Sequence, residues 1–264
     1  MGIIIGIKRR KSQPMVLETR ASPLTGELTL PPPFTLVRLR ELGDAFAYAQ
    51  SVAAERGAGT LVYVGRFDLA EFAVVLEPDE PLKQARRAFY AGMAALADAL
   101  VAHAQPETEI TIDWPDTLSV NRGLVGGGRL AWPQGTKETE TPAWLVFGAM
   151  IRTVSMSGTD PGLNPLVTAL EEEGFSDAMS DHVVESFARH FMVAIDTWRE
   201  KGFGAVARSY LEHLPADKGV RRDIDETGDL LIGRMGQTQA ERVPLLPRLA
   251  KPAWFDPAAK GPRT

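Results

Sequence analysis

Hydrophobic residues recur along the chain with two different periods, and the shorter period predicts β-strands. Polar and apolar residues alternate from Phe34 to Leu39, and two apolar, β-branched runs follow at residues 61–64 and 70–76. Alternation and short β-branched runs are typical of strands. Because only residues 65–68 and one further position separate the two runs, we expect the strands to pair with each other.

Elsewhere apolar residues repeat every three or four positions, which predicts amphipathic helices that bury one face. The clearest stripe runs from Leu82 to Leu100, and it predicts a long helix against a sheet. Asn164 and Pro165 are suited to begin a short helix, and Ser180 is suited to cap a longer one. The predicted helices span residues 43–56, 81–103, 164–174, 180–201 and 203–214.

A Trp-Pro turn between two short strands is the most distinctive local pattern. Residues 109–113 alternate as a half-buried strand does, and Pro115 cannot donate to a strand ladder. We therefore expect a turn at residues 114–117, a new strand from Leu118, and a tight hairpin at Asn121–Gly123.

Three consecutive glycines interrupt the strand that follows this hairpin. Gly126, Gly127 and Gly128 leave bare backbone that a ligand could approach closely. The alternative is a glycine-rich bulge packed against a helix, and the glycines alone leave both interpretations open. Strand alternation also predicts that Gly127 and Arg129 point to the same face.

Together these elements predict an α+β fold with one mainly antiparallel or mixed sheet and helices packed on one face. Pro31 to Pro33 and the polar residues 215–219 favour breaks in the chain, and residues 224–232 have the form of a hairpin. We therefore expect three parts. These are an N-terminal extension at residues 1–33, a main domain at 34–214, and a small C-terminal β-containing part at 215–264.

Composition narrows the classes of partner. Of 264 residues, 44% are hydrophobic and 24% charged, and the net charge of −5 gives no reason to expect nucleic acid or an anionic membrane surface as partner. No apolar run approaches the roughly 20 residues that span a bilayer. The first 11 residues carry their basic residues after the apolar ones, unlike a secretory signal. A cytoplasmic location is expected.

The chain contains no cysteine, which excludes disulfides, thiolate metal ligands and a cysteine nucleophile. Its histidines are His103, His182, His190 and His213, and they show no spacing typical of metal ligands. No metal site is predicted.

The Trp114-Pro115 hairpin and the glycine strand resemble the central motif of the biotin and lipoate protein ligases. Further segments agree with the family pattern over roughly residues 34–214, and residues 224–232 resemble a shortened form of its C-terminal domain. The agreeing segments are Gly57–Thr60, Val146–Thr153 with Gly148, Thr168–Gly174 and Trp198–Tyr210. The resemblance implies the fold of the ligase catalytic domain. It also implies ATP, biotin or lipoate, and attachment of an acyl group to a lysine of a biotinyl or lipoyl carrier domain.

The sequence departs from the family where the chemistry takes place. The arginine-rich phosphate loop is reduced to residues 65–71, which hold one cation, Arg66, and two carboxylates. The position of the family lysine that polarises the acid is occupied here by Leu124. The position of the family lysine before Trp-Pro is occupied here by Asp113. Where the family has an asparagine on a later strand, this chain has Arg152. Where the family has Ser-Thr-Asn at its first helix, this chain has Gly-Asp-Ala at residues 43–45.

The candidate ligand-binding residues are therefore glycines and arginines that could replace the lost cations, since arginine grips carboxylates and phosphates bidentately. For Arg66 and Arg122 a solvated surface role is equally open. No catalytic residue is assigned. The candidates are Arg66, Trp114, Asp116, Gly126, Gly127, Gly128, Arg129, Gly148 and Arg152.

Three functions remain open from the sequence. The first is a divergent acyl-protein ligase or acyltransferase for a biotin- or lipoate-like acid. The second is a catalytically inactive ligase-fold protein that binds a small acid, a nucleotide or a carrier domain. The third is a structural partner with a vestigial cleft. Fold resemblance alone does not choose among them.

Overall fold

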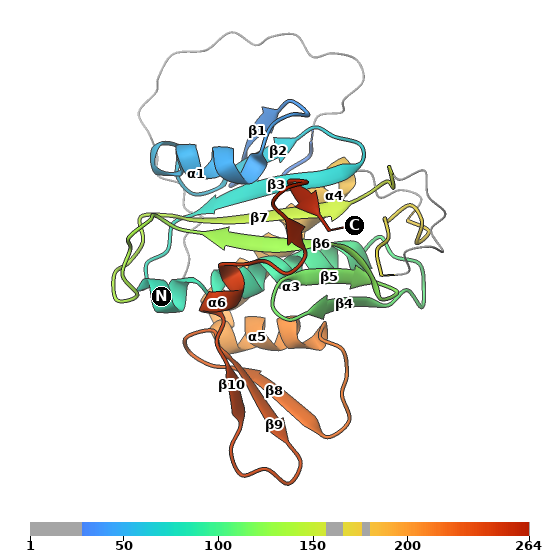
Figure 1. The fold of residues 1–264 in the computed structure, drawn as a ribbon. Helices are drawn as coiled ribbons and strands as arrows, with labels where there is room; N and C mark the ends of the chain where they lie inside the picture. The colour runs from blue at the N-terminus through green and yellow to red at the C-terminus, as the bar shows by residue number, and fades with distance from the viewer. Residues whose placement is uncertain (1–27, 157–165, 176–179, 264) are drawn as a thin grey trace.

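A seven-stranded mixed sheet forms the centre of the molecule (Figure 1), in a computed structural model that describes residues 28–156, 166–175 and 180–263. Its order is β1-β2-β3-β7-β6-β5-β4, with β1 and β2 parallel and the other pairs antiparallel. The strands are β1 (Thr35–Leu39), β2 (Thr60–Val64), β3 (Leu69–Leu76), β4 (Ile110–Asp113), β5 (Thr117–Val120), β6 (Gly123–Ala131) and β7 (Leu145–Arg152). The predicted α+β class is confirmed.

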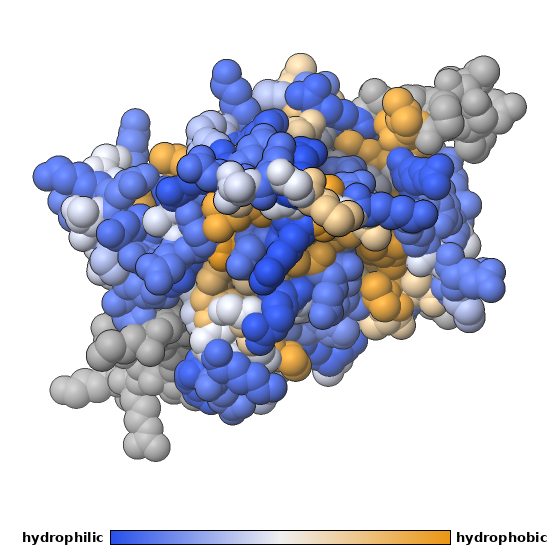
Figure 2. Space-filling model, turned by 90° about the horizontal axis from the view of Figure 1, so that it is seen from below, coloured by the Kyte–Doolittle hydropathy of each residue, from blue (hydrophilic) through white to orange (hydrophobic). Residues whose placement is uncertain are grey.

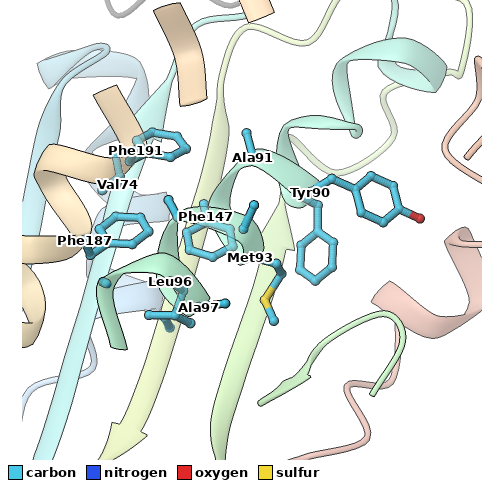
Figure 3. Packing of buried hydrophobic residues seen from close by; sticks show 14 of the residues in the cluster. Val74, Tyr90, Ala91, Met93, Leu96, Ala97, Phe147, Phe187 and Phe191 are labelled. Carbon is cyan, nitrogen blue, oxygen red and sulfur yellow. The ribbon is translucent and has the colours of Figure 1, made fainter. Parts of the chain in front are cut away.

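The longer helices α3 (Ala88–Val101), α4 (Ser180–Lys201) and α5 (Phe203–Glu212) cover one face of this sheet. Alternate residues of β3 and β7 point into the interface between the sheet and these helices. There the ring of Phe147 stacks on those of Phe187 and Phe191 in α4, with centroid distances of 5.7 and 6.4 Å (Figure 3). Burial of each large apolar side chain contributes about 1.5–3 kcal/mol, so this layer is the main source of stability.

The expectation that all helices pack on one face is corrected by α1 (Ala45–Arg56), which covers the opposite face. Its buried residues Ala45, Ala49 and Ala53 pack on the other set of alternate strand residues, among them Val62 and Val146. The small alanine side chains let this helix lie close to the sheet. Only part of this second face is covered by α1.

Two helix predictions are also corrected. The predicted helix at residues 81–103 is divided into α2 (Leu82–Ala85) and α3, because the buried side chains of Arg86 and Arg87 bind Glu138 and Glu80 across a tight turn. Residues 166–174 form turns instead of a helix, with Val167 bridged to Leu124 of β6. Asn164 and Pro165, the expected start of that helix, lie outside the described residues.

The C-terminal part contains the predicted hairpin and four further elements that were not predicted, β10, α6, β11 and β12. Strands β8 (Val220–Ile224), β9 (Leu230–Arg234) and β10 (Glu241–Val243) form a small sheet that projects from the main domain (Figure 1). Tyr90 of α3 anchors it through a 2.5 Å hydrogen bond to the Gly228 carbonyl. Seen from the projecting end, the surface is mainly hydrophilic, with hydrophobic side chains visible between the polar ones (Figure 2).

The chain then turns back across the second face of the main sheet. Helix α6 (Leu246–Leu249) and the short strands β11 (Phe255–Asp256) and β12 (Gly261–Pro262) lie in this stretch. We call residues 246–263 the C-terminal segment, and its strand β12 contacts β6 and β7 (Figure 1). Within the described ranges, no helix has the length and hydrophobicity that crossing a membrane requires.

Candidate functional site

The three consecutive glycines of β6, Gly126 to Gly128, each lie against a different neighbour. A side chain at Gly126, whose φ is +157°, would place its Cβ 1.9 Å from the Met150 carbonyl oxygen. A Cβ at Gly128 would lie 2.5 Å from the sulfur of Met93 in α3. At Gly127 it would meet the Asp116 carbonyl oxygen at 2.0 Å and the Trp254 ring at 2.5 Å. Backbone oxygens therefore require glycine at positions 126 and 127, whereas at 128 the nearest atoms belong to side chains.

The C-terminal segment covers the face of β6 to which Gly127 points. The side chain of Trp254 is fully buried and packs against Leu69 and Met150. Its indole Nε1 donates a 3.0 Å hydrogen bond to the carbonyl oxygen of Gly128. The space that the missing side chain of Gly127 leaves open is thus filled by this protein's own tryptophan.

Asp116 ties the same segment to the Trp-Pro turn. Its carboxylate accepts hydrogen bonds from the Ala253 backbone N–H at 3.0 Å and from the Thr117 hydroxyl at 3.0 Å. The side chain is buried, and burial raises the pKa of this carboxyl to about 6. Asp116 therefore holds the C-terminal segment in place and is placed away from open solvent.

Arg129 lies on the same face of β6 as Gly127, as strand alternation predicts. Its guanidinium carbon is 4.4 Å from the ring centroid of Phe46 in α1 and 4.3 Å from that of Phe255 in β11. The side chain is only 12% exposed, and burial lowers its pKa. The Nε nitrogen is buried and donates to no protein atom within the described residues.

The carboxylates nearest to Arg129 are engaged elsewhere. Asp44 comes within 3.9 Å of an Arg129 nitrogen, but the same oxygen caps α1 by accepting the Ala47 N–H at 2.8 Å. Glu71 accepts the Ala45 N–H at 2.9 Å, and burial raises its pKa. Arg129 therefore keeps hydrogen-bonding capacity for a group outside the protein.

A pocket of about 540 Å³ opens beside Arg129. Its walls come from the main sheet, from Phe46, and from the C-terminal segment, and its lining carries three cations and no carboxylate. Pockets of this size hold small molecules, and apolar walls with a few polar groups are typical of them. The lining residues are Phe46, Arg129, Leu130, Leu249, Ala250, Lys251, Pro252, Phe255, Pro257 and Arg263.

Arg66 and Arg152 line a different and smaller pocket of about 150 Å³, together with Lys260. Arg66 forms a bidentate ion pair with Asp68 at 2.6 and 3.0 Å, which leaves it little capacity for a ligand. Arg152 donates to the backbone carbonyls of Pro262 and Arg263 at 3.1 Å. These two arginines hold a loop and the end of the chain.

The remaining predicted residues divide between the two faces. Gly148 lies on the face of Arg129, where a Cβ would come 2.4 Å from the Phe46 ring. Trp114 packs against the main core, and its indole donates to the Tyr90 hydroxyl at 3.2 Å. The pocket beside Arg129 lies between α1, β6 and the C-terminal segment. The expected cleft between Trp114 and the glycines stays a prediction.

Sequence reasoning missed the residues that complete this pocket. Lys251, Phe255 and Arg263 belong to a proline-rich tail without helical or strand periodicity. The available signal was the adjacent Trp254 and Phe255, an aromatic pair that a solvated tail does not need. In the described part of the chain, no three His, Asp or Glu residues gather as a metal site would require.

Comparison with known protein families places the chain. A sequence model of the biotin/lipoate A/B protein ligase family matches residues 30–212. Among proteins of curated function, none matches the chain.

Solved structures agree with this assignment. A biotin protein ligase-like protein of unknown function from Silicibacter sp. TM1040 is 26% identical, with a TM-score of 0.70 over 83% of this chain and 97% of its own. The apo biotin protein ligase of Aquifex aeolicus is 15% identical, with a TM-score of 0.60 over 80% and 95% of the two chains. The structure of that ligase in complex with biotin and ATP is 14% identical to this chain, with a TM-score of 0.57 over 79% of this chain and 94% of its own. The family match covers more than half of the chain, which therefore belongs to the biotin/lipoate A/B protein ligase family.

Proposed function

We propose that this protein is a non-catalytic member of its family that binds a small organic acid in the pocket beside Arg129. The observation that carries the proposal is Arg129, whose side chain lines a pocket of about 540 Å³, packs against Phe46 and Phe255, and is paired with a carboxylate only at 3.9 Å. A carboxylate in such a place makes charge-assisted hydrogen bonds, which are about twice as strong as neutral ones.

Three further observations support binding without adenylation. Joining an acid to the α-phosphate of ATP requires fixed cations aimed at the phosphates. The loop where the family carries them holds Arg66, which is paired with Asp68. The family lysine position is Leu124, and Trp254 occupies the space over Gly127. An arginine does not serve as a general base at neutral pH.

The test combines a binding measurement with a search for product. Calorimetric titration of the full chain with octanoate, biotin or lipoate in the absence of ATP should detect binding of at least one acid. Incubation of the same acids with ATP and Mg²⁺ should release no pyrophosphate and give no acyl-adenylate by mass spectrometry. Arg129→Gln should abolish acid binding, and Lys218→Ala, which changes an exposed cation at the far end of the molecule, should leave it intact.

The second candidate is an acyl-protein ligase that transfers a biotin- or lipoate-like group to a carrier-domain lysine. Membership of the family favours it, and the aligned Aquifex aeolicus structure holds biotin and ATP. Formation of an acyl-adenylate in the experiment above would establish this candidate and reject the non-catalytic function. The variant Trp254→Ala extends the test to a chain in which the space over Gly127 is open.

A further inference from the structure

The cations that line the pocket beside Arg129 come from two different parts of the chain. Arg129 belongs to β6, whereas Lys251 and Arg263 belong to the C-terminal segment. Both wall residues are exposed, and neither forms an ion pair with a carboxylate among the residues that the structure covers. The chain as a whole carries a net charge of −5, whereas the charged residues that line this pocket are all cations.

The environment of Arg129 also selects the geometry of its ligand. The aromatic rings of Phe46 and Phe255 pack against the guanidinium, with centroids 4.4 and 4.3 Å from its central carbon. The N–H donors of a guanidinium lie in its plane, so a ligand forms hydrogen bonds with it along the edge. A planar carboxylate approaching along that edge can form two parallel N–H···O bonds, a geometry that arginine supports and lysine does not.

The other lining residues of the pocket are apolar. They include Leu130, Leu249 and Pro252, together with Phe46 and Phe255. A ligand body of methylene or methyl groups would be removed from water there, and each buried CH₂ contributes about 0.8 kcal/mol. The pocket therefore combines an arginine suited to a carboxylate, apolar walls, and two further cations that the C-terminal segment supplies.

We propose that the ligand of this pocket is a two-headed acid: an aliphatic chain that carries a carboxylate at one end and a second anionic group at the other. This inference rests on the proposed function, because it names the class of acid that the pocket binds. Arg129 binds the first carboxylate edge-on, and Lys251 with Arg263 binds the second anionic group near solvent. A neutral or single-headed acid uses only the first of these contacts.

The test is a calorimetric series on the full chain at fixed ionic strength. Straight-chain dicarboxylates from butanedioate to decanedioate are compared with the monocarboxylates of equal length and with inorganic phosphate. At least one dicarboxylate should bind ten-fold or more tightly than its matched monoacid, and inorganic phosphate should bind more weakly than either. Raising the salt concentration should weaken the dicarboxylate more than the monoacid.

Two variants assign the contacts. The double variant Lys251→Ala/Arg263→Ala should reduce the best dicarboxylate to the affinity of its monoacid and leave the monoacid unchanged. Arg129→Gln should abolish binding of both, while Lys218→Ala should change neither. Thermal melts of each variant establish that it folds. Loss of monoacid binding in the folded double variant would contradict the division of contacts.

The outcomes separate the two proposals. Equal affinity of every dicarboxylate and its monoacid would overturn the two-headed ligand while leaving acid binding in place. Absence of binding by any acid would overturn both proposals. Acyl-adenylate formation together with a ten-fold preference for a dicarboxylate would overturn only the non-catalytic function.

Discussion

The indole Nε1 of Trp254 donates a 3.0 Å hydrogen bond to the carbonyl oxygen of Gly128, although the two residues are 126 positions apart. The same ring lies where a side chain at Gly127 would have to be. The bare backbone of the glycine strand and the C-terminal segment are therefore complementary. In this protein the strand's second face is an interface within the chain.

Replacing Trp254 measures how strongly this interface stabilises the fold. Trp254→Ala should lower the free energy of unfolding by about 3–5 kcal/mol, because it removes a fully buried ring. Trp254→Phe keeps a ring and loses the hydrogen bond to Gly128, so it should lose only about 1–2 kcal/mol. Denaturant unfolding of both variants gives the comparison. Similar losses in the two would show that the hydrogen bond, and not the packing, dominates.

Gly127→Ala should be strongly destabilising, and Gly204→Ala should not. The new Cβ at Gly127 would lie 2.0 Å from a backbone oxygen, which cannot move without disturbing β5. Overpacking of this kind costs about 1–3 kcal/mol or more. At Gly204, in helix α5, nothing lies within 4 Å of the added atom, and alanine favours a helix by up to about 1 kcal/mol. Thermal melts of the two variants should therefore shift in opposite directions.

Asp116 predicts a specific dependence of stability on pH. Burial raises the pKa of its carboxyl from 3.8 to about 6 in the folded protein, so the folded state binds this proton more tightly than the unfolded chain. The contribution of this group to stability is therefore fully present below pH 4 and is lost as pH rises through 6. The difference corresponds to at most about 3 kcal/mol.

The check is the unfolding free energy of the wild type and of Asp116→Asn between pH 4 and 7.5. The asparagine keeps an oxygen that can accept the Ala253 N–H, and it has no charge to bury. Relative to the variant, the wild type should lose stability across this interval as pH rises. An identical pH dependence of the two proteins would contradict the raised pKa.

Arg129→Met should cost little stability while removing the binding of acids. A buried charge that is poorly paired is destabilising, and an apolar side chain of similar length often restores or improves stability by 1–4 kcal/mol. The lost contacts with Phe46 and Phe255 act in the other direction, at about 0.5–2 kcal/mol each. We therefore expect a change within about 2 kcal/mol by denaturant unfolding. A much larger loss would identify Arg129 as a structural residue.

Local periodicity predicted most of the sheet and its turns. The hairpin at Asn121 and Arg122 has positive φ at both residues. The pairing of β6 with β5 shifts register between Leu118 and Ser119, as at a β-bulge, and β6 then pairs regularly with β7 from Gly126 onward, which places Gly127 and Arg129 on one face. The class of fold follows from such patterns because strand alternation reports which face is buried. The position of α1 on the other face could not be read in this way, since a stripe of small residues does not specify which face of the sheet it covers.

The pocket was less predictable, because its parts are far apart in sequence. Arg129 was identified from its strand, whereas Phe255, Lys251 and Arg263 lie in a tail whose prolines indicate only irregular structure. The assignment of Arg66 and Arg152 as possible ligand contacts rested on charge. Their hydrogen bonds to Asp68 and to the carbonyls of Pro262 and Arg263 depend on tertiary contacts that no local pattern encodes.

The order of synthesis has a consequence for this pocket. Ribosomes make the chain from its N-terminus, so Arg129 and Phe46 emerge well before residues 246–263. Until that stretch is released, the guanidinium has one aromatic neighbour instead of two, and the wall that carries Lys251 and Arg263 is missing. A nascent chain therefore has no complete pocket before residue 263 has emerged, and we expect a ligand to stabilise only chains translated beyond that point.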